Sequence, residues 1–331
     1  MKRIHKQEGV DLPKEGTLEW LLAGEPWVVY RTLTHLLGMN EKNKEVVRAK
    51  ESIRDHPLIK NIFKRLNQEG YWGTSKDIHT WWPKKDTTFW ILPVLADFGF
   101  TKQAKRIAKT CEYVFSTQLE SGGFGWDPPN KPADCHSAII IESLSKMGFL
   151  KDPRLQKSYE WLNQRQRLDG GFWCKDTGLI GRPREKEPSC ALATTFVLGA
   201  LAQNPKYKSS MVVKSGIDFL LNCWKNQGKI KYAGHDSQIG TDWAKLKYPF
   251  TDYKILKYLD VLSQFEYAKT KLRKSKIVNL LLSKQDDTGR FTPESIHQVW
   301  SKFDFGQKEK PSRWITLLSL GILKRIYSDQ S

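Results

Sequence analysis

Residues 166–173 read Gln-Arg-Leu-Asp-Gly-Gly-Phe-Trp, and versions of this motif recur along the 331-residue chain. Residues 118–126 repeat it closely, shorter versions lie at 68–72 and 285–291, and a degenerate copy lies at 226–228. The leading glutamines are roughly 50 to 60 positions apart, a period typical of supersecondary repeats that each bury an apolar face on the next. The motif therefore predicts a repeat architecture.

Two kinds of helix alternate around the motif. Amphipathic helices with one charged face precede it, and they are expected at Thr101–Thr117, from Asp152, at Lys208–Lys225 and at Lys269–Lys284. Nearly uncharged helices follow it, at Ser137–Met147, Cys190–Ala202 and Trp314–Leu323. A helix that is apolar on every side is buried on every side, so the second kind predicts an inner layer and the first an outer layer.

The expected inner helices share an opening signal, a proline or aspartate where the helix starts. They begin near Pro26, Asp86, Asp134, Pro188, Pro249 and Pro311. Five outer helices lie between them, and Thr17–Ala23 is a candidate for the sixth. We therefore predict an all-α fold, an (α/α)6 toroid of six inner and six outer helices. It forms one domain over residues 1–331, with a repeat body at about 17–327.

The glycines and the aromatic side chains of the motif have a structural interpretation. The glycines permit tight turns with positive φ at the end of each outer helix. The glutamine can hydrogen-bond loose backbone groups at the turn, and Phe124, Trp126, Phe172 and Trp173 are expected to pack between repeats. The motif itself is thus predicted to be structural rather than catalytic.

Composition limits the class of protein. There are 54 Lys and Arg against 36 Asp and Glu, a net charge of +18, with 39% hydrophobic residues. The excess of positive charge fits a solvated lysine-rich surface or a peripheral anionic membrane, and no nucleic-acid-binding motif is present. No apolar run approaches the roughly 20 residues that span a bilayer. We expect a cytoplasmic protein.

The motif resembles the QW repeat of squalene–hopene cyclases and the related repeat of protein prenyltransferase β subunits. The resemblance runs from about Thr17 to Tyr327 and is strongest to stand-alone, uncharacterised prenyltransferase/squalene-cyclase-like proteins. It implies a toroid around an apolar cavity that takes an isoprenoid or lipid. The Asp-x-Asp-Asp acid of class II cyclases is absent, and Asp134 and Cys135 are adjacent, unlike the Asp-x-Cys zinc pair of prenyltransferases.

The cysteines are the sharpest local signal of chemistry. Cys135 lies at the start of the third inner helix and Cys190 just inside the fourth, while Cys174 follows the motif at 166–173. On a toroid all three lie at one rim, and three thiolates can bind zinc. The alternative is that these small side chains only fill the starts of helices.

Residues beside Cys135 could complete such a site. His136, Asp134 or the more distant His235 could provide a fourth zinc ligand, or leave a position open for water. Asp134 and His136 are accordingly the catalytic candidates. Zinc is the one cofactor that the sequence suggests.

A stripe on the first inner helix is the second candidate site. Trp27, Arg31 and His35 recur four residues apart, and they could grip a diphosphate or carboxylate head group. The alternative is a hydrogen-bond network to the opposite inner helices. Further ligand-binding candidates line the inner layer and its rim: Trp82, Trp90, Tyr253, Arg313 and Trp314.

Three functions remain open on this sequence. One is an enzyme of the terpenoid cyclase or prenyltransferase type acting on an isoprenoid or lipid. The second is a non-catalytic toroid that binds a lipid or a peptide, and the third is a repeat scaffold with a filled interior. An acid or a metal open to an apolar ligand would favour the enzyme.

Overall fold

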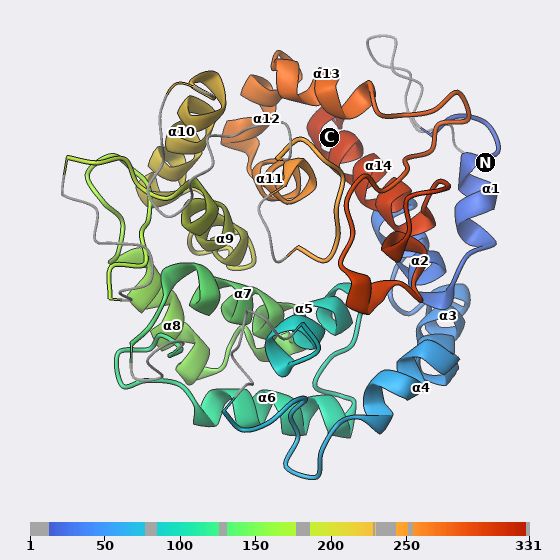
Figure 1. The fold of residues 1–331 in the computed structure, drawn as a ribbon, viewed down its shortest axis with the longest axis horizontal. Coiled ribbons are helices and arrows are strands. Elements are labelled where there is room, and N and C mark those ends of the chain that lie inside the picture. Colours follow the sequence, from blue (N-terminus) through green and yellow to red (C-terminus); the bar gives the residue numbers. More distant parts are fainter. Residues whose placement is uncertain are drawn as a thin grey trace. The chain divides into compact units, whose positions relative to one another are not determined.

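The computed structural model describes residues 13–76, 85–125, 131–176, 186–227, 229, 243–250 and 254–328. The regular secondary structure in these ranges is helical, and no strand occurs there apart from isolated bridges (Figure 1). This confirms the predicted all-α class. None of the helices within these ranges is long and apolar enough to cross a bilayer. The chain forms two compact units.

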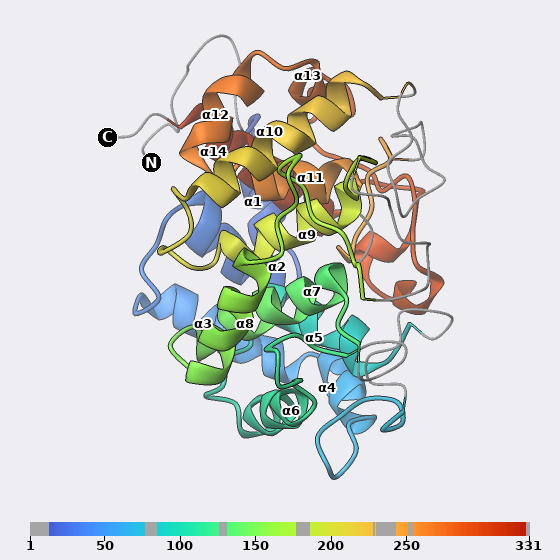
Figure 2. The same cartoon turned by 90° about the vertical axis from the view of Figure 1, so that its left-hand side faces the viewer.

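Unit 2, residues 66–244 together with 251–253, contains three inner and three outer helices. The inner helices are α5 (Thr88–Phe98), α7 (Asp134–Leu144) and α9 (Ala191–Leu201). The outer helices are α6 (Lys105–Ser116), α8 (Pro153–Asn163) and α10 (Met211–Lys225). α7 packs between α5 and α9, and α8 and α10 cover α7 and α9 respectively (Figure 2). Every residue of α7 and α9 is buried, as their largely uncharged sequences predict.

Unit 1 holds residues 1–65, 245–250 and 254–331. Its helices are α1 (Thr17–Leu22), α2 (Pro26–Arg31), α3 (Lys44–Asp55), α4 (Pro57–Lys64), α11 (Ile255–Leu262), α12 (Glu266–Arg273), α13 (Lys276–Leu282) and α14 (Arg313–Tyr327). α14 packs on α2, α11 and α12, so it occupies the centre of this unit. Short π-helical turns extend α2 at Thr32–Leu36 and α7 at Ser145–Phe149.

Two predicted boundaries are wrong. The fifth inner helix does not begin at Pro249 but at Ile255, and the residue before it, Lys254, still has extended backbone angles. The expected outer helix at Lys269–Lys284 is two helices, since Ser275 ends the first stretch and caps α13 with a bond to the Ile277 N–H. α2 and α7 begin at their predicted signals, and α5, α9 and α14 begin two or three residues after theirs.

The glycines of the repeated motif pack each turn closely against the next outer helix. Gly70, Gly122, Gly170 and Gly289 all have positive φ. A Cβ on Gly122 or Gly170 would lie 2.8 or 2.7 Å from a backbone oxygen of α8 or α10, so only glycine allows this approach. A Cβ on Gly289 would lie 3.0 Å from the side-chain atoms Thr17 Oγ1 and Lys14 Cβ, so the last turn rests on the start of α1.

Side chains of the motif add hydrogen bonds within the turn and to the next outer helix. Gln166 Nε2 donates to the Gly170 carbonyl within the turn (2.8 Å) and to the Val212 carbonyl of α10 (2.7 Å). Gln118 does the same with Gly122 and Arg154. These bonds confirm that the glutamine satisfies loose backbone groups at the turn. Of the predicted packing aromatics, Phe124, Phe172 and Trp173 are buried and Trp126 lies outside the described residues.

The following inner helix supplies a hydroxyl to the same turn. The backbone N–H of Phe172 donates to Thr194 Oγ1 of α9 at 2.9 Å. The same bond joins three more pairs: Trp72 with Thr88, Phe124 with Ser137, and Phe291 with Thr316. Each turn is therefore bonded to an outer and an inner helix at once.

The close approach at Gly170 can be tested against a matched glycine. Gly38 also has positive φ, but a Cβ there would meet nothing within 4 Å. We expect Gly38→Ala to lower the free energy of unfolding by about 1–2 kcal/mol through backbone strain alone. Gly170→Ala should cost about 2–4 kcal/mol, because the turn must also move away from α10. Urea unfolding of both variants measures the difference, and equal losses would contradict the proposed contact.

Candidate functional site

A buried ion pair lies at the start of α7. Asp134, the first residue of that helix, is fully buried, and Arg165 Nε donates to its Oδ1 at 2.7 Å. Arg165 follows α8 and directly precedes the motif glutamine. Its guanidinium also lies 2.7 Å from Asp176 Oδ2 and 4.6 Å from the centre of the Trp161 ring. Arg165 thus joins an inner-helix acid to the segment that follows the motif.

The environment of Asp134 suits a carboxyl that exchanges a proton. Burial raises the pKa of Asp134 to about 7, and the neighbouring positive charge of Arg165 opposes that rise. Its Oδ2 is buried and has no hydrogen-bond partner among the described residues. One oxygen is therefore held by a cation while the other is available to carry a proton.

Three cysteines gather beside this acid. Cys135 Sγ and Cys174 Sγ are 3.2 Å apart, and the Cys135 backbone N–H donates to Cys174 Sγ at 3.4 Å. Cys190, the N-cap of α9, pairs with Phe172 in an isolated antiparallel bridge, which places it near Cys174. The hydrogen bond to Cys174 and burial raise the pKa of Cys135, and burial raises that of Cys190 to about 12. Cys135 and Cys190 are therefore neutral thiols at physiological pH.

The zinc site stays a prediction. Over the ranges that the structure describes, no group of three or more His, Cys, Asp or Glu side chains could hold a metal ion. His136 points toward α5, where its ring stacks on Phe89 with centroids 4.5 Å apart. His235, the other imidazole considered from the sequence, lies outside the described residues.

The stripe on the first inner helix runs from the core to solvent. Trp27 is fully buried against His56, with ring centroids 4.7 Å apart. Arg31 Nη1 lies 3.1 Å from Nε2 of His35, which is exposed. The π-helical turn at 32–36 changes the spacing of side chains around the axis, so Trp27 and His35 do not share one environment.

The remaining ligand-binding candidates fall in different places. Trp90 is buried in α5, and Trp314 is buried in α14 with its ring 5.5 Å from that of Tyr248. Arg313 Nε donates to the Trp20 carbonyl, so it joins α14 to α1. Trp82 and Tyr253 lie outside the described residues.

Sequence reasoning missed a second buried acid, in unit 1. Asp304 Oδ2 accepts from Ser312 Oγ at 2.9 Å and from the Trp314 N–H at 3.0 Å, so it caps α14. Burial and the charge of Glu25 raise its pKa. The flanking aromatics Phe303 and Phe305 were the available signal of a buried acid. Arg165 was also missed, although its place before Gln166 could have indicated it.

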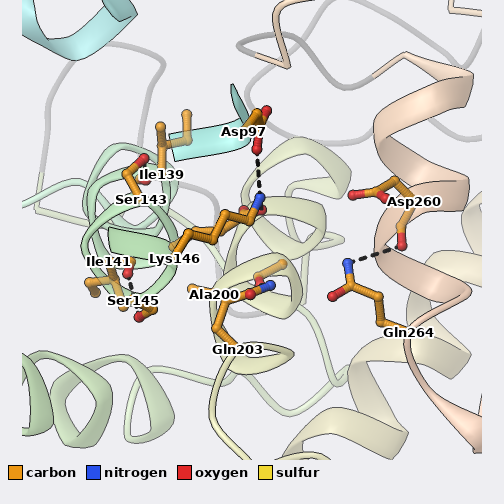
Figure 3. A network of polar contacts seen from close by, with 12 residues as sticks. Asp97, Ile139, Ile141, Ser143, Ser145, Lys146, Ala200, Gln203, Asp260 and Gln264 are labelled. Atoms are coloured by element: carbon orange, nitrogen blue, oxygen red, sulfur yellow. Dashed lines mark hydrogen bonds and ion pairs between the residues drawn. The ribbon is translucent and has the colours of Figure 1, made fainter. Parts of the chain in front are cut away.

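A separate charged cluster lies at the C-terminal ends of the inner helices of unit 2. Figure 3 shows Lys146 pointing to Asp97, with Nζ 2.9 Å from Asp97 Oδ1, and Nζ is also 2.7 Å from Glu142 Oε1. Two carboxylates here share one ammonium group. In contrast to these carboxylates, Asp134 keeps one oxygen without a hydrogen-bond partner in the part of the chain that the structure describes.

Comparison with known proteins identifies one family. Residues 74–248, more than half of the chain, match the model of the squalene-hopene cyclase C-terminal domain. No curated protein matches.

Solved structures give a more distant likeness. A protein from Actinoplanes has 13% identity and a TM-score of 0.47 over 92% of this chain and 90% of its own. The type II terpene cyclase MstE from Scytonema has 14% identity and a TM-score of 0.47, and the match covers 90% of this chain and 87% of the cyclase chain. A polysaccharide lyase has 11% identity and a TM-score of 0.46, and the match covers 93% of this chain and 92% of the lyase chain. Because these TM-scores are below 0.5, the family assignment rests on the sequence match.

Replacing Arg165 tests the buried ion pair. We expect Arg165→Gln to lower the free energy of unfolding by about 3–5 kcal/mol near neutral pH, because Asp134 is left buried without its cation. The loss should shrink as pH falls toward about 5, since the unpaired carboxyl has a folded pKa above its unfolded value and folding favours its protonated form. Urea unfolding at several pH values measures both effects.

Arg154→Gln is the matched control. Arg154 also bonds two carboxylates, Asp152 and Glu112, but it is 40% exposed. Its replacement should cost about 1 kcal/mol or less. A loss for Arg165→Gln that is as small as the control, or that grows at low pH, would contradict the buried pair.

Proposed function

Because this chain belongs to the squalene-hopene cyclase C-terminal domain family, we propose that it is an isoprenoid cyclase in which Asp134 donates the initiating proton. The observation that carries the proposal is the asymmetric environment of the carboxyl. Oδ1 is bonded to Arg165, and the buried Oδ2 has no partner among the described residues. The Asp-x-Asp-Asp acid is absent, so a different acid must serve.

Protonating an alkene needs a donor with two conflicting properties. The acid must hold its proton near neutral pH, and its conjugate base must be stable once the proton has left. Burial supplies the first property, since it raises the pKa of Asp134 to about 7. Arg165 supplies the second, because its charge at 2.7 Å stabilises the carboxylate.

The surroundings of the acid suit an apolar, cationic intermediate. Trp161 and Trp173 are largely buried on the segments next to Arg165 and Cys174, and their indole rings can stabilise positive charge through their π faces. The thiols of Cys135 and Cys190 are neutral and therefore weak nucleophiles, so they do not compete with the substrate's own C=C bonds for the carbocation. An isoprenoid chain is the ligand class that this environment favours.

The reaction balances without a cofactor. Asp134 transfers its proton to a terminal carbon of a C=C bond, and the resulting cation is attacked by the next C=C bond of the same chain to close a ring. The final cation loses a proton to solvent or takes up water, and the carboxylate is protonated again. The product is an isomer or a hydrate of the substrate.

Incubation with linear isoprenoids tests the proposal. Purified protein is mixed with squalene or geranylgeraniol, and organic extracts are analysed by gas chromatography and mass spectrometry. We expect cyclic isomers from the wild type that carry one added deuterium when the reaction is run in D2O. Asp134→Asn should lower turnover by at least about 100-fold, because the amide cannot donate an acidic proton.

Asp287→Asn is the control, since Asp287 is an exposed carboxylate in the turn at 285–291. It should leave turnover unchanged. Cyclisation that persists in a folded Asp134→Asn variant would overturn the assignment of the acid. Another outcome is that native mass spectrometry shows a retained isoprenoid while neither the wild type nor the Asp287→Asn variant converts it. That result would instead support a lipid-binding function.

A further inference from the structure

We propose that Cys135 and Cys174 form a reversible disulfide, so that this dithiol is an oxidative modification site for a small-molecule disulfide such as oxidised glutathione. The proposal does not depend on proton donation by Asp134. It concerns the pair itself, which joins the first turn of α7 to the segment after the motif at 166–173.

Geometry distinguishes this pair from the other cysteines. All five cysteines are thiols, and the sulfurs of Cys135 and Cys174 lie 3.2 Å apart. A disulfide bond is about 2.05 Å long, so bond formation requires the sulfurs to approach by about 1 Å. Cys174 lies on an irregular segment rather than within a helix, which can supply that movement.

The two sulfurs have different roles in the exchange. Cys174 is partly exposed and accepts the Cys135 backbone N–H, whereas Cys135 is only 8% exposed. Cys174 is therefore the sulfur that an external disulfide reaches, and Cys135 is the sulfur that resolves the mixed disulfide.

The exchange conserves atoms and electrons. The Cys174 thiolate attacks one sulfur of oxidised glutathione, and the first glutathione leaves as a thiolate that takes up a proton. Cys135 then loses its proton, attacks Cys174 Sγ and releases the second glutathione. The protein loses two hydrogen atoms and two thiols, and one molecule of oxidised glutathione becomes two molecules of glutathione.

The other three cysteines are held elsewhere. Cys190 Sγ accepts the Ala193 N–H as the cap of α9, so a bond to Cys190 would remove that cap. Cys111 is fully buried in α6 with its sulfur 3.6 Å from that of Met147, and Cys223 is fully buried in α10. Neither of the last two is within reach of a bulky external disulfide.

Oxidation would also change the neighbourhood of Asp134. Trp173 and Asp176 lie on the segment that carries Cys174, and Asp176 pairs with Arg165. A covalent bond to α7 would hold this segment against the start of the helix. The oxidised protein should therefore melt at a higher temperature than the reduced protein, since the bond closes a long loop in the unfolded chain.

Thiol counting and peptide mapping test the proposal on the full chain. The protein is equilibrated with glutathione buffers from about −300 to −180 mV in the presence of a chelator, quenched in acid, denatured and labelled with a maleimide. We expect two fewer labelled thiols at the oxidising end, restored by dithiothreitol. Trypsin with a glutamyl protease separates Cys111 from Cys135 by cutting at Glu112 and Glu120, so the cross-linked peptides identify the pair.

Variants give independent readouts. Cys111→Ser and Cys223→Ser should still lose two labelled thiols on oxidation. Cys135→Ser should instead leave a stable mixed disulfide between Cys174 and glutathione, because the resolving sulfur is gone. A cross-link between Cys174 and Cys190, or wild-type protein that keeps all five thiols at −180 mV, would overturn the proposal.

Discussion

The contact on which the rest of the structure depends is the close packing of each glycine turn on the outer helix that follows, which at Gly122 and Gly170 is an approach to a backbone carbonyl. At Gly170 this approach leaves no room for a Cβ atom. The glutamine and the aromatic residue of the motif then bond Val212 of α10 and Thr194 of α9. One short loop thereby fixes the spacing between two layers of helices, and the bond to an inner-helix hydroxyl recurs in four turns.

The same arrangement positions the acid. Because the turn at 166–173 is bonded to α9 and α10, the residue before it, Arg165, is held at a constant place beside the start of α7. Asp134 begins that helix, so the ion pair follows from the architecture and needs no dedicated loop. Burial and one cation then give the carboxyl a pKa near neutrality, and burial keeps nearby thiols protonated.

The fold could be predicted largely from periodic patterns, and the site only in part. Uncharged stretches identified α7 and α9, and the motif identified the turns. Local signals failed at Pro249, because the helix begins only at Ile255, after the extended residue Lys254. Asp134 and the cysteines were recognised from their place at helix starts. Arg165 was missed because its partner lies 31 residues away, beyond the reach of any spacing rule.

The turn at 285–291 has a consequence for the newly made chain. It rests on α1, and α14 packs on α2, so unit 1 combines the first residues of the sequence with the last. Unit 2 is nearly continuous, at 66–244. During synthesis the middle of the protein can fold while the N-terminal helices wait for α14 to leave the ribosome. Until then the surface of α2 that packs on α14 in the folded protein lacks that partner.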